Sequence, residues 1–243
     1  MDDVLSVTTL PRAVHEALRE SIIAQRVPPG STVTEKAVAE RFGVARPTAK
    51  AALERLVAEG LLRRTAHKTA RVPELDRDDI VDLYANRAVV EEAALRRLAE
   101  AGEVPDQALS AQRSLIEAAR DAGMDHPDAG PLARADIMFH RALVEAQPSP
   151  RLARLHALLM GEIELCIGQV LAHRLLALGD VVDQHQGILD AVSAGDVELA
   201  GRLTRAHIDG ARDRLLTYFD ETRLALPGAQ STEQGEEGSR NRV

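Results

Sequence analysis

Aromatic residues are scarce in this 243-residue chain, which has two tyrosines, three phenylalanines and no tryptophan. β-Sandwiches and β-barrels draw heavily on aromatic and β-branched residues, so this shortage disfavours those folds. Alanine and leucine instead supply 70 residues, and both are strong helix formers. The composition therefore predicts a mainly α-helical protein, long enough for one large domain or two ordinary ones.

Long apolar runs and paired cysteines are also missing. The longest stretch without a charged residue is nine positions, whereas a membrane helix needs roughly 20 apolar residues. The start, Met1-Asp-Asp-Val, lacks the basic and apolar segments of a secretory signal, so we expect a cytoplasmic protein with no membrane partner. The single cysteine, Cys166, cannot form an internal disulfide, and its apolar neighbours favour packing in a core over catalysis.

The net charge of −8 conceals two segments of opposite sign. Residues 1–73 hold 12 basic and 8 acidic side chains, a balance of +4, and residues 74–243 hold 18 and 30, a balance of −12. A basic segment is typical of nucleic-acid binding. We therefore predict a DNA-binding domain over 1–73 and a separate helical domain over 74–226. The remaining residues, 227–243, have almost nothing to bury and are predicted to be a disordered tail.

The pattern of the N-terminal segment predicts a winged helix-turn-helix. Apolar spacing at Val14, Leu18, Ile22 and Ile23 indicates a first helix that stops before Val27-Pro-Pro-Gly. Thr34 can cap a second helix, and Pro47 suits the first turn of a third helix that stops before Gly60. Short strand-like pieces on both sides of 66–69 fit a β-hairpin wing. In this fold the third helix enters the major groove of DNA with its N-terminal residues toward the bases.

The candidate DNA contacts are basic or polar side chains on these elements. They are Lys36 of the second helix, Arg46, Thr48 and Lys50 at the start of the third, and His67 and Lys68 on the wing. Arg46 could read a guanine with two hydrogen bonds or clamp a phosphate, and the sequence does not separate these roles. For any single residue the alternative is an ordinary solvated basic face.

Residues 12–72 resemble the DNA-binding domain of the GntR family of transcriptional regulators. The motifs that carry the resemblance occur in order: Pro29-Gly30, Val33-Thr34-Glu35, Gly43-Val44-Ala45-Arg46-Pro47-Thr48 and Glu59-Gly60-Leu61. The chain departs from the family pattern with Ala45 for serine and Lys50 for arginine, and a lysine loses the two-pronged hydrogen bonding of an arginine. The resemblance implies a homodimer that binds double-stranded operator DNA of roughly two-fold symmetry.

The segment from Asp76 to about Leu226 predicts an antiparallel helical bundle. Breaks in the helical pattern give about six helices; they lie near Gly102, 123–131, 148–150, Gly179 and 193–195. Such a bundle can hold a binding site among its inward-facing side chains.

Four side chains of this bundle have the chemistry of metal ligands. Asp136 and His140 are four residues apart and would share one face of a helix. His185 and His207 fall on two later helices and are each followed by core-like residues. One aspartate with three histidines suits Zn²⁺, Ni²⁺ or Mn²⁺. By spacing alone, each histidine taken separately is more often an ordinary helical residue than a ligand.

Residues 76–220 resemble the FCD domain, the all-helical effector domain of one GntR subfamily. The matching motifs are Arg87-x-x-x-Glu91, Asp136-x-x-Phe139-His140, His185-x-x-Ile188 and a closing His207. The resemblance implies that Asp136, His140, His185 and His207 bind a divalent metal, zinc first, and that a small carboxylate effector completes its coordination. Arg87 then resembles the arginine that faces the effector, and Tyr84 would line the pocket. The other histidines, His15, His126, His156 and His173, match no motif and are interpreted as structural or surface residues.

These observations together predict a ligand-responsive transcriptional regulator, with repression relieved by ligand ahead of activation. The first alternative is a metal-dependent hydrolase, but the sequence shows no nucleophile motif or evident general base beside the four ligands. The second is a regulator whose site is free of metal or takes a long acyl ligand. We expect a regulator and not an enzyme.

Overall fold

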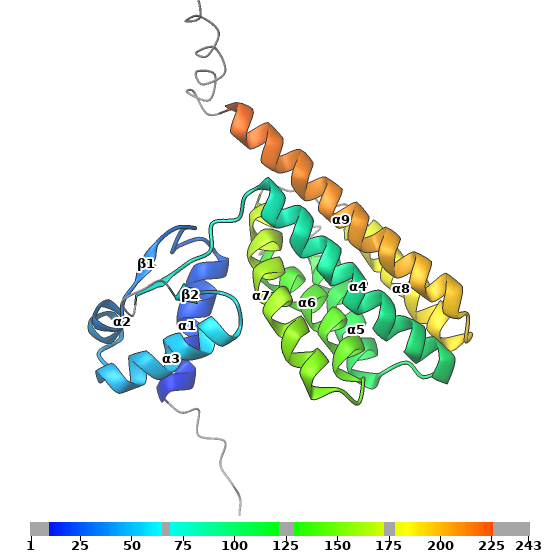
Figure 1. Cartoon of the computed structure of the whole chain (residues 1–243), viewed down its shortest axis with the longest axis horizontal. Helices are drawn as coiled ribbons and strands as arrows, with labels where there is room; N and C mark the ends of the chain where they lie inside the picture. The colour runs from blue at the N-terminus through cyan, green and yellow to red at the C-terminus, as the bar shows by residue number, and fades with distance from the viewer. Residues whose placement is uncertain (1–9, 65–68, 122–128, 173–177, 226–243) are drawn as a thin grey trace, which may run out of the picture.

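The computed structural model describes residues 10–64, 69–121, 129–172 and 178–225 (Figure 1). The N-terminal part contains α1 (Leu10–Ile23), β1 (Thr32–Val33), α2 (Glu35–Phe42), α3 (Arg46–Ala58), β2 (Arg63–Arg64) and β3 (Ala70–Arg71). The C-terminal part contains α4 (Arg77–Ala101), α5 (Asp106–Asp121), α6 (Ala129–Glu145), α7 (Pro150–Ala172), α8 (Leu178–Ser193) and α9 (Val197–Ala225). The prediction of a mainly α-helical protein, with a winged helix-turn-helix before a helical bundle, is confirmed.

Local signals set the ends of α2 and α3. The Thr34 hydroxyl accepts a hydrogen bond from the backbone N–H of Ala37 at 3.1 Å and caps the start of α2. Gly43 ends the same helix in the left-handed conformation, with φ of 63°. The cap position of α3 is Ala45, whose methyl side chain cannot accept a hydrogen bond, and Pro47 occupies the first turn. The predicted helix, turn and helix therefore form as expected.

The three short strands form one antiparallel sheet in the order β1–β3–β2. Arg71 of the central strand lies opposite Thr32 of β1 on one side and Arg63 of β2 on the other. Strands β2 and β3 pair as the predicted wing. β1 was not predicted, because a strand of two residues is too short to show an alternating pattern.

The C-terminal bundle is organised around the long helices α4 and α9, which run side by side (Figure 1). A reciprocal capping box starts α4, with Asp76 accepting from the N–H of Asp79 at 2.8 Å and Asp79 accepting in return at 3.2 Å. Helix α8 begins at Leu178, so the helix boundary expected near Gly179 is found one residue before that glycine.

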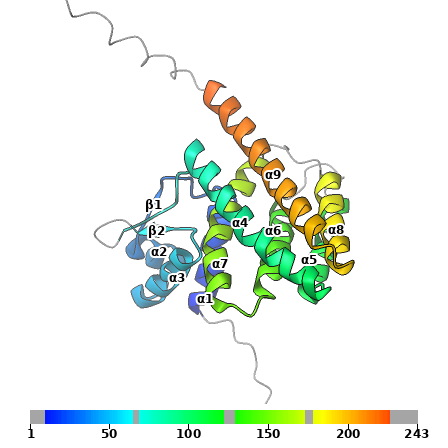
Figure 2. The same ribbon diagram turned by 45° about the vertical axis from the view of Figure 1, so that its right-hand side comes forward.

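Helix α7 of the bundle packs against α1 of the N-terminal part (Figure 2). Among the helices that the structure describes, none is both long and apolar enough to cross a membrane. The predicted tail, 227–243, lies outside the described residues, as do the wing residues His67 and Lys68.

Candidate metal centre and DNA-binding surface

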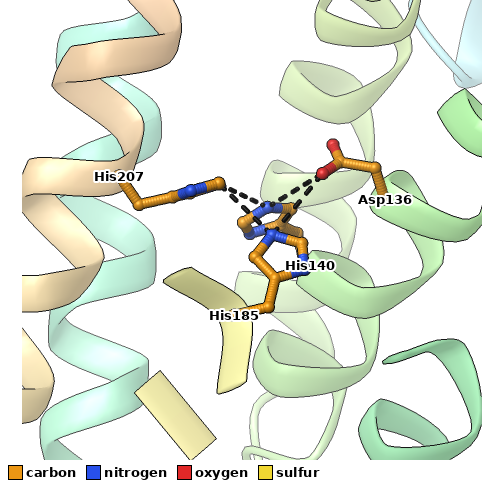
Figure 3. A group of neighbouring side chains, drawn as sticks. All are labelled: Asp136, His140, His185 and His207. Atoms are coloured by element: carbon orange, nitrogen blue, oxygen red, sulfur yellow. Dashed lines mark hydrogen bonds and ion pairs between the residues drawn. The ribbon is translucent and has the colours of Figure 1, made fainter. Parts of the chain in front are cut away.

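The four predicted metal ligands meet inside the bundle (Figure 3). Helix α6 supplies Asp136 and His140 one turn apart, α8 supplies His185, and α9 supplies His207. One potential ligand atom from each residue lies within 4.8 Å of all the others. The three histidines are buried and Asp136 is partly exposed. Three helices that are distant in the sequence thus place one carboxylate and three imidazoles around a common point.

The distances between these atoms match the edges of a coordination polyhedron. The Nε2 atom of His207 lies 3.2 Å from that of His140 and 3.3 Å from that of His185. The Asp136 Oδ1 atom lies 3.5 Å from His185 Nε2 and 3.9 Å from His140 Nε2. Ligand atoms bound to tetrahedral zinc at about 2.1 Å are about 3.4 Å apart. The four atoms therefore need only small movements to surround one ion.

Hydrogen bonds at the far side of two rings fix which nitrogen faces the centre. His140 donates from Nδ1 to Glu91 Oε2 at 2.6 Å, and His207 donates from Nδ1 to the amide oxygen of Gln184 at 2.8 Å. In the form that binds a metal, where each imidazole is neutral and carries its one hydrogen on Nδ1, both Nε2 atoms present a lone pair. The two Nε2 atoms lie 3.2 Å apart, and a cation between them would accept both lone pairs. This donor set therefore fits a divalent metal.

His185 is held in a different way. Its ring stacks on Phe139, with ring centres 3.8 Å apart and planes 6° apart, and its Nδ1 atom has no hydrogen-bond partner among the described residues. Burial, together with the His207 and His140 rings, lowers the pKa of His185 well below 6.5. Burial, followed by His140 and Arg87, does the same to the pKa of His207. Both rings are therefore neutral at pH 7 and keep a lone pair for a metal.

A buried carboxylate, Glu91, connects the cluster to its surroundings. Besides His140, it accepts hydrogen bonds from Arg87 Nε at 2.8 Å and from His156 Nε2 at 3.0 Å. Burial alone would raise the pKa of Glu91, but Arg87 and His140 outweigh it and hold the pKa well below 4.5. Glu91 is therefore ionised. Burial likewise acts to lower the pKa of Arg87, but Glu91 overcomes it and keeps the guanidinium charged.

The structure places both predicted effector residues beside this carboxylate. Arg87 is 1% exposed, and its Nη2 group has no hydrogen-bond partner in the part of the chain that the structure describes. Tyr84 is also buried, and its ring centre lies 5.7 Å from the Arg87 guanidinium carbon. Burial raises the pKa of Tyr84, so its hydroxyl stays protonated. A buried donor without a partner costs free energy, and an anion bound beside it would supply one.

Sequence reasoning missed three residues around the cluster. In the sequence, Glu91 stands out only as part of a motif, Gln184 carries no signal, and His156 is predicted to be a structural or surface residue. His156 is buried and bonds to Glu91. The spacing of Arg87 and Glu91, four apart on one helix, was the one available signal for their pairing. Nothing in the local sequence marks His156 or Gln184, because packing alone brings them to the site.

The candidate DNA contacts lie on the N-terminal part. Arg46 and Lys50 are exposed one turn apart at the start of α3, and Thr48 between them is half-buried. Lys36 is exposed on α2 and pairs with Glu40 at 3.8 Å. The structure adds Arg64 of β2, which reaches Glu54 of α3 at 3.7 Å, as does Lys50. The sequence alone does not mark Arg64, because its place beside α3 depends on how the sheet packs.

Comparisons with known proteins agree with this architecture. The GntR family of bacterial regulatory proteins matches residues 10–72, and the FCD domain matches residues 82–210. A "Probable D-xylose utilization operon transcriptional repressor" of Paenarthrobacter nicotinovorans is 28% identical over 84% of this chain and 88% of the relative. The HTH-type transcriptional repressor NanR of Citrobacter rodentium is 26% identical, over 82% of this chain and 83% of that protein. A solved GntR transcriptional regulator from Rhodococcus sp. RHA1 is 26% identical, with a TM-score of 0.68 over 85% of this chain and 97% of that one.

A winged helix-turn-helix joined to an all-helical domain defines a two-domain DNA-binding regulator. The chain belongs to the GntR family and carries an FCD domain. It is a transcriptional regulator and not an enzyme, as the sequence indicated.

Proposed function

We propose that this regulator is a homodimeric repressor, with a DNA-binding domain over 1–73 and an effector domain over 74–226. The effector domain binds one divalent metal, zinc in the first place, and a small carboxylate effector. Asp136, His140, His185 and His207 would hold the metal. Binding of the effector would shift the protein between DNA-competent and DNA-incompetent arrangements, because a ligand favours whichever arrangement it binds better.

The close approach of the His140 and His207 Nε2 atoms, 3.2 Å apart, is the observation that carries the metal assignment. Their Nδ1 hydrogens are committed to Glu91 and Gln184, so neither ring can donate to the other while both are neutral. Three imidazoles and one carboxylate, with four of their six ligand-atom pairs at 3.2–3.9 Å and all within 4.8 Å, are a donor set that favours zinc. The metal, when bound, would take an oxygen ligand by expanding its coordination beyond the four protein donors.

Charge balance supports an anionic effector. With the four ligands in their metal-binding forms, Arg87 carries one positive charge and Glu91 and Asp136 carry one negative charge each, so these side chains sum to −1. A divalent ion changes this to +1, and that excess favours a monoanion. Arg87 Nη2 is a buried donor without a described partner and would pair with one carboxylate oxygen. Tyr84 packs beside this guanidinium and would border the same ligand.

Metal analysis tests the first half of the proposal. Protein stripped with EDTA, resupplied with Zn²⁺ and desalted is expected to retain about one equivalent per chain, because a site of this kind holds its ion tightly. His185→Ala should lose most of it. Asp183→Ala, an exposed position on the same helix, is the matched control and should retain the metal. Less than about 0.2 equivalents in the unchanged protein would contradict the assignment.

Thermal shift measurements test the second half. A panel of small mono-, di- and tricarboxylates is screened against stripped and zinc-loaded protein, since a ligand of the folded state raises the melting temperature. We expect carboxylates to raise it only when zinc is bound. Equal shifts in stripped protein would place the anion elsewhere. A ligand found in this way is then tested for release of DNA duplexes that the protein itself selects from a random pool.

A further inference from the structure

Helix α7 contributes side chains to the cores of both parts of the protein. Leu165 packs into the core of the winged helix-turn-helix, together with Leu18 of α1 and Leu56 of α3. The next residue, Cys166, packs into the core of the bundle, on the same side as Ile163. The two parts therefore share one helix (Figure 2).

Two glycines allow the backbones of the two parts to touch. A Cβ atom at Gly161 of α7 would lie 1.6 Å from the carbonyl oxygen of Glu59, at the end of α3. A Cβ atom at Gly60 would lie 2.6 Å from the carbonyl oxygen of Leu158, and Gly60 also has a φ of 77°. Real Cβ contacts are never this short, so only glycine fits on either side. The C-terminal end of α3 therefore packs directly against the backbone of α7.

Ion pairs flank this contact. Arg19 of α1 pairs with Glu164, which is buried on α7, and Arg19 also lies 4.0 Å from Glu59. On the other side, Arg63 of β2 pairs with Glu162 at 2.8 Å. We call Glu59, Gly60 and Gly161, with the pairs at Arg19 and Arg63, the α7 junction.

The same helix touches the candidate metal site five residues before the junction. His156 bonds to one oxygen of Glu91 at 3.0 Å, while the other oxygen accepts from the metal ligand His140 at 2.6 Å. Five residues of α-helix span about 7.5 Å, and a helix over this length moves as a rigid rod. A shift of His140 toward a metal would therefore act on Glu91, on His156, and on the position of α7.

We propose that α7 is the element that transmits occupancy of the metal site to the DNA-binding domain, through Glu91–His156 at one end and the α7 junction at the other. This inference rests on the proposed function, since it requires that a metal binds at the four ligands. Close-packed backbone at Gly161 cannot absorb a displacement by local compression. A movement of α7 must therefore carry α3 with it, which changes how the two recognition helices of a dimer meet successive half-sites on DNA.

Gly161→Ala tests this proposal, with Gly187→Ala as the matched control. A Cβ atom at Gly187 of α8 would lie 3.7 Å from its nearest neighbour, Leu203, which is an ordinary contact. Both glycines are inside helices, so both substitutions gain the same helix propensity. The measurement is the affinity of EDTA-stripped full-length protein for a self-selected DNA duplex, with and without Zn²⁺, alongside the Zn²⁺ affinity itself.

In the unchanged protein and in Gly187→Ala, Zn²⁺ is expected to change the affinity for DNA at least about fivefold, the lower end of ordinary coupling between two sites. In Gly161→Ala the Zn²⁺ affinity should stay within about twofold, and the effect of Zn²⁺ on DNA binding should fall below about twofold. Arg19→Gln leaves both glycines in place and should reduce the coupling at least about twofold, which keeps the test decisive if Gly161→Ala does not fold.

The outcomes distinguish a failure of the transmission through α7 from a failure of the metal site. If the unchanged protein binds Zn²⁺ but its affinity for DNA does not respond, the transmission through α7 is refuted and the metal site stands. If full coupling persists in Gly161→Ala, or in Arg19→Gln where the glycine variant is unfolded, the junction does not transmit. If the unchanged protein binds no Zn²⁺, the proposed function and the inference built on it both fail.

Discussion

Replacing Glu91 with glutamine should damage both the stability of the effector domain and its affinity for metal. Glu91 and Arg87 are both essentially inaccessible to solvent and lie 2.8 Å apart. Removing one charge of a buried pair leaves the other unpaired, which costs about 3–5 kcal/mol. Glutamine can still accept one hydrogen bond, so we expect a loss near 3 kcal/mol. The weaker hold on His140 should lower the affinity for Zn²⁺ by about 10- to 100-fold, as for other residues that orient a metal ligand.

The neighbouring residue provides a matched control. Glu92→Gln removes the same charge one position along α4, from surface pairs with Arg96 at 3.2 Å and Arg205 at 2.9 Å. Such pairs contribute at most about 1 kcal/mol each. Urea unfolding of stripped protein measures the stability, and competition with a chromogenic chelator measures the Zn²⁺ affinity. If Glu91→Gln changes the stability and the Zn²⁺ affinity no more than Glu92→Gln does, the buried network around Glu91 neither stabilises the domain nor orients His140.

Three further results are expected. Because the pKa values of His185 and His207 are lowered in the folded protein, the unfolded chain binds more protons below pH 6.5. The stability of stripped protein should therefore fall from pH 7 to pH 5.5, by up to about 1.4 kcal/mol per pH unit for each extra proton; constant stability in urea titrations would refute neutral buried rings. Arg46→Ala should weaken binding to a self-selected duplex by about 1–3 kcal/mol if it reads a base, whereas Lys50→Ala should lower the salt slope by about one; unchanged anisotropy titrations for both would show that α3 does not face DNA. Arg87→Met should abolish the zinc-dependent thermal shift with carboxylates, and a retained shift would exclude Arg87 as the anion partner.

Local chemistry explains why the DNA-binding domain could be predicted closely. Thr34, Gly43 and Pro47 each act on their own turn of backbone, so their positions in the sequence give the ends of α2 and α3. The contribution of α7 to the same domain could not be predicted this way. Leu165 reads as one more apolar residue of a helix, and only the tertiary structure shows that it belongs to the N-terminal core.

For the candidate metal site too, only the local features could be predicted from the sequence. Asp136 and His140 could be paired from sequence because four residues bring two side chains onto one helix face. The approach of His185 and His207 from other helices was an inference from apolar neighbours and from resemblance, and the structure brings them to within hydrogen-bonding range of each other. The roles of His156 and Gln184 depend on contacts between residues more than 20 positions apart, for which a single sequence has no signal.

The interior of the effector domain is less suited to stability than to binding. An apolar pair of similar size in place of Arg87 and Glu91 would be neutral or stabilising in most proteins, and four histidines are buried close by or around them. These groups lie together at one place, where two imidazole nitrogens approach to 3.2 Å and one guanidinium donor has no partner among the described residues. A cation and an anion bound together would satisfy all of these groups. Binding of a metal and an anion therefore supplies stability that the domain lacks without them. Helix α7 is bonded to this network through His156, so it becomes more ordered when these ligands bind and less ordered when they leave.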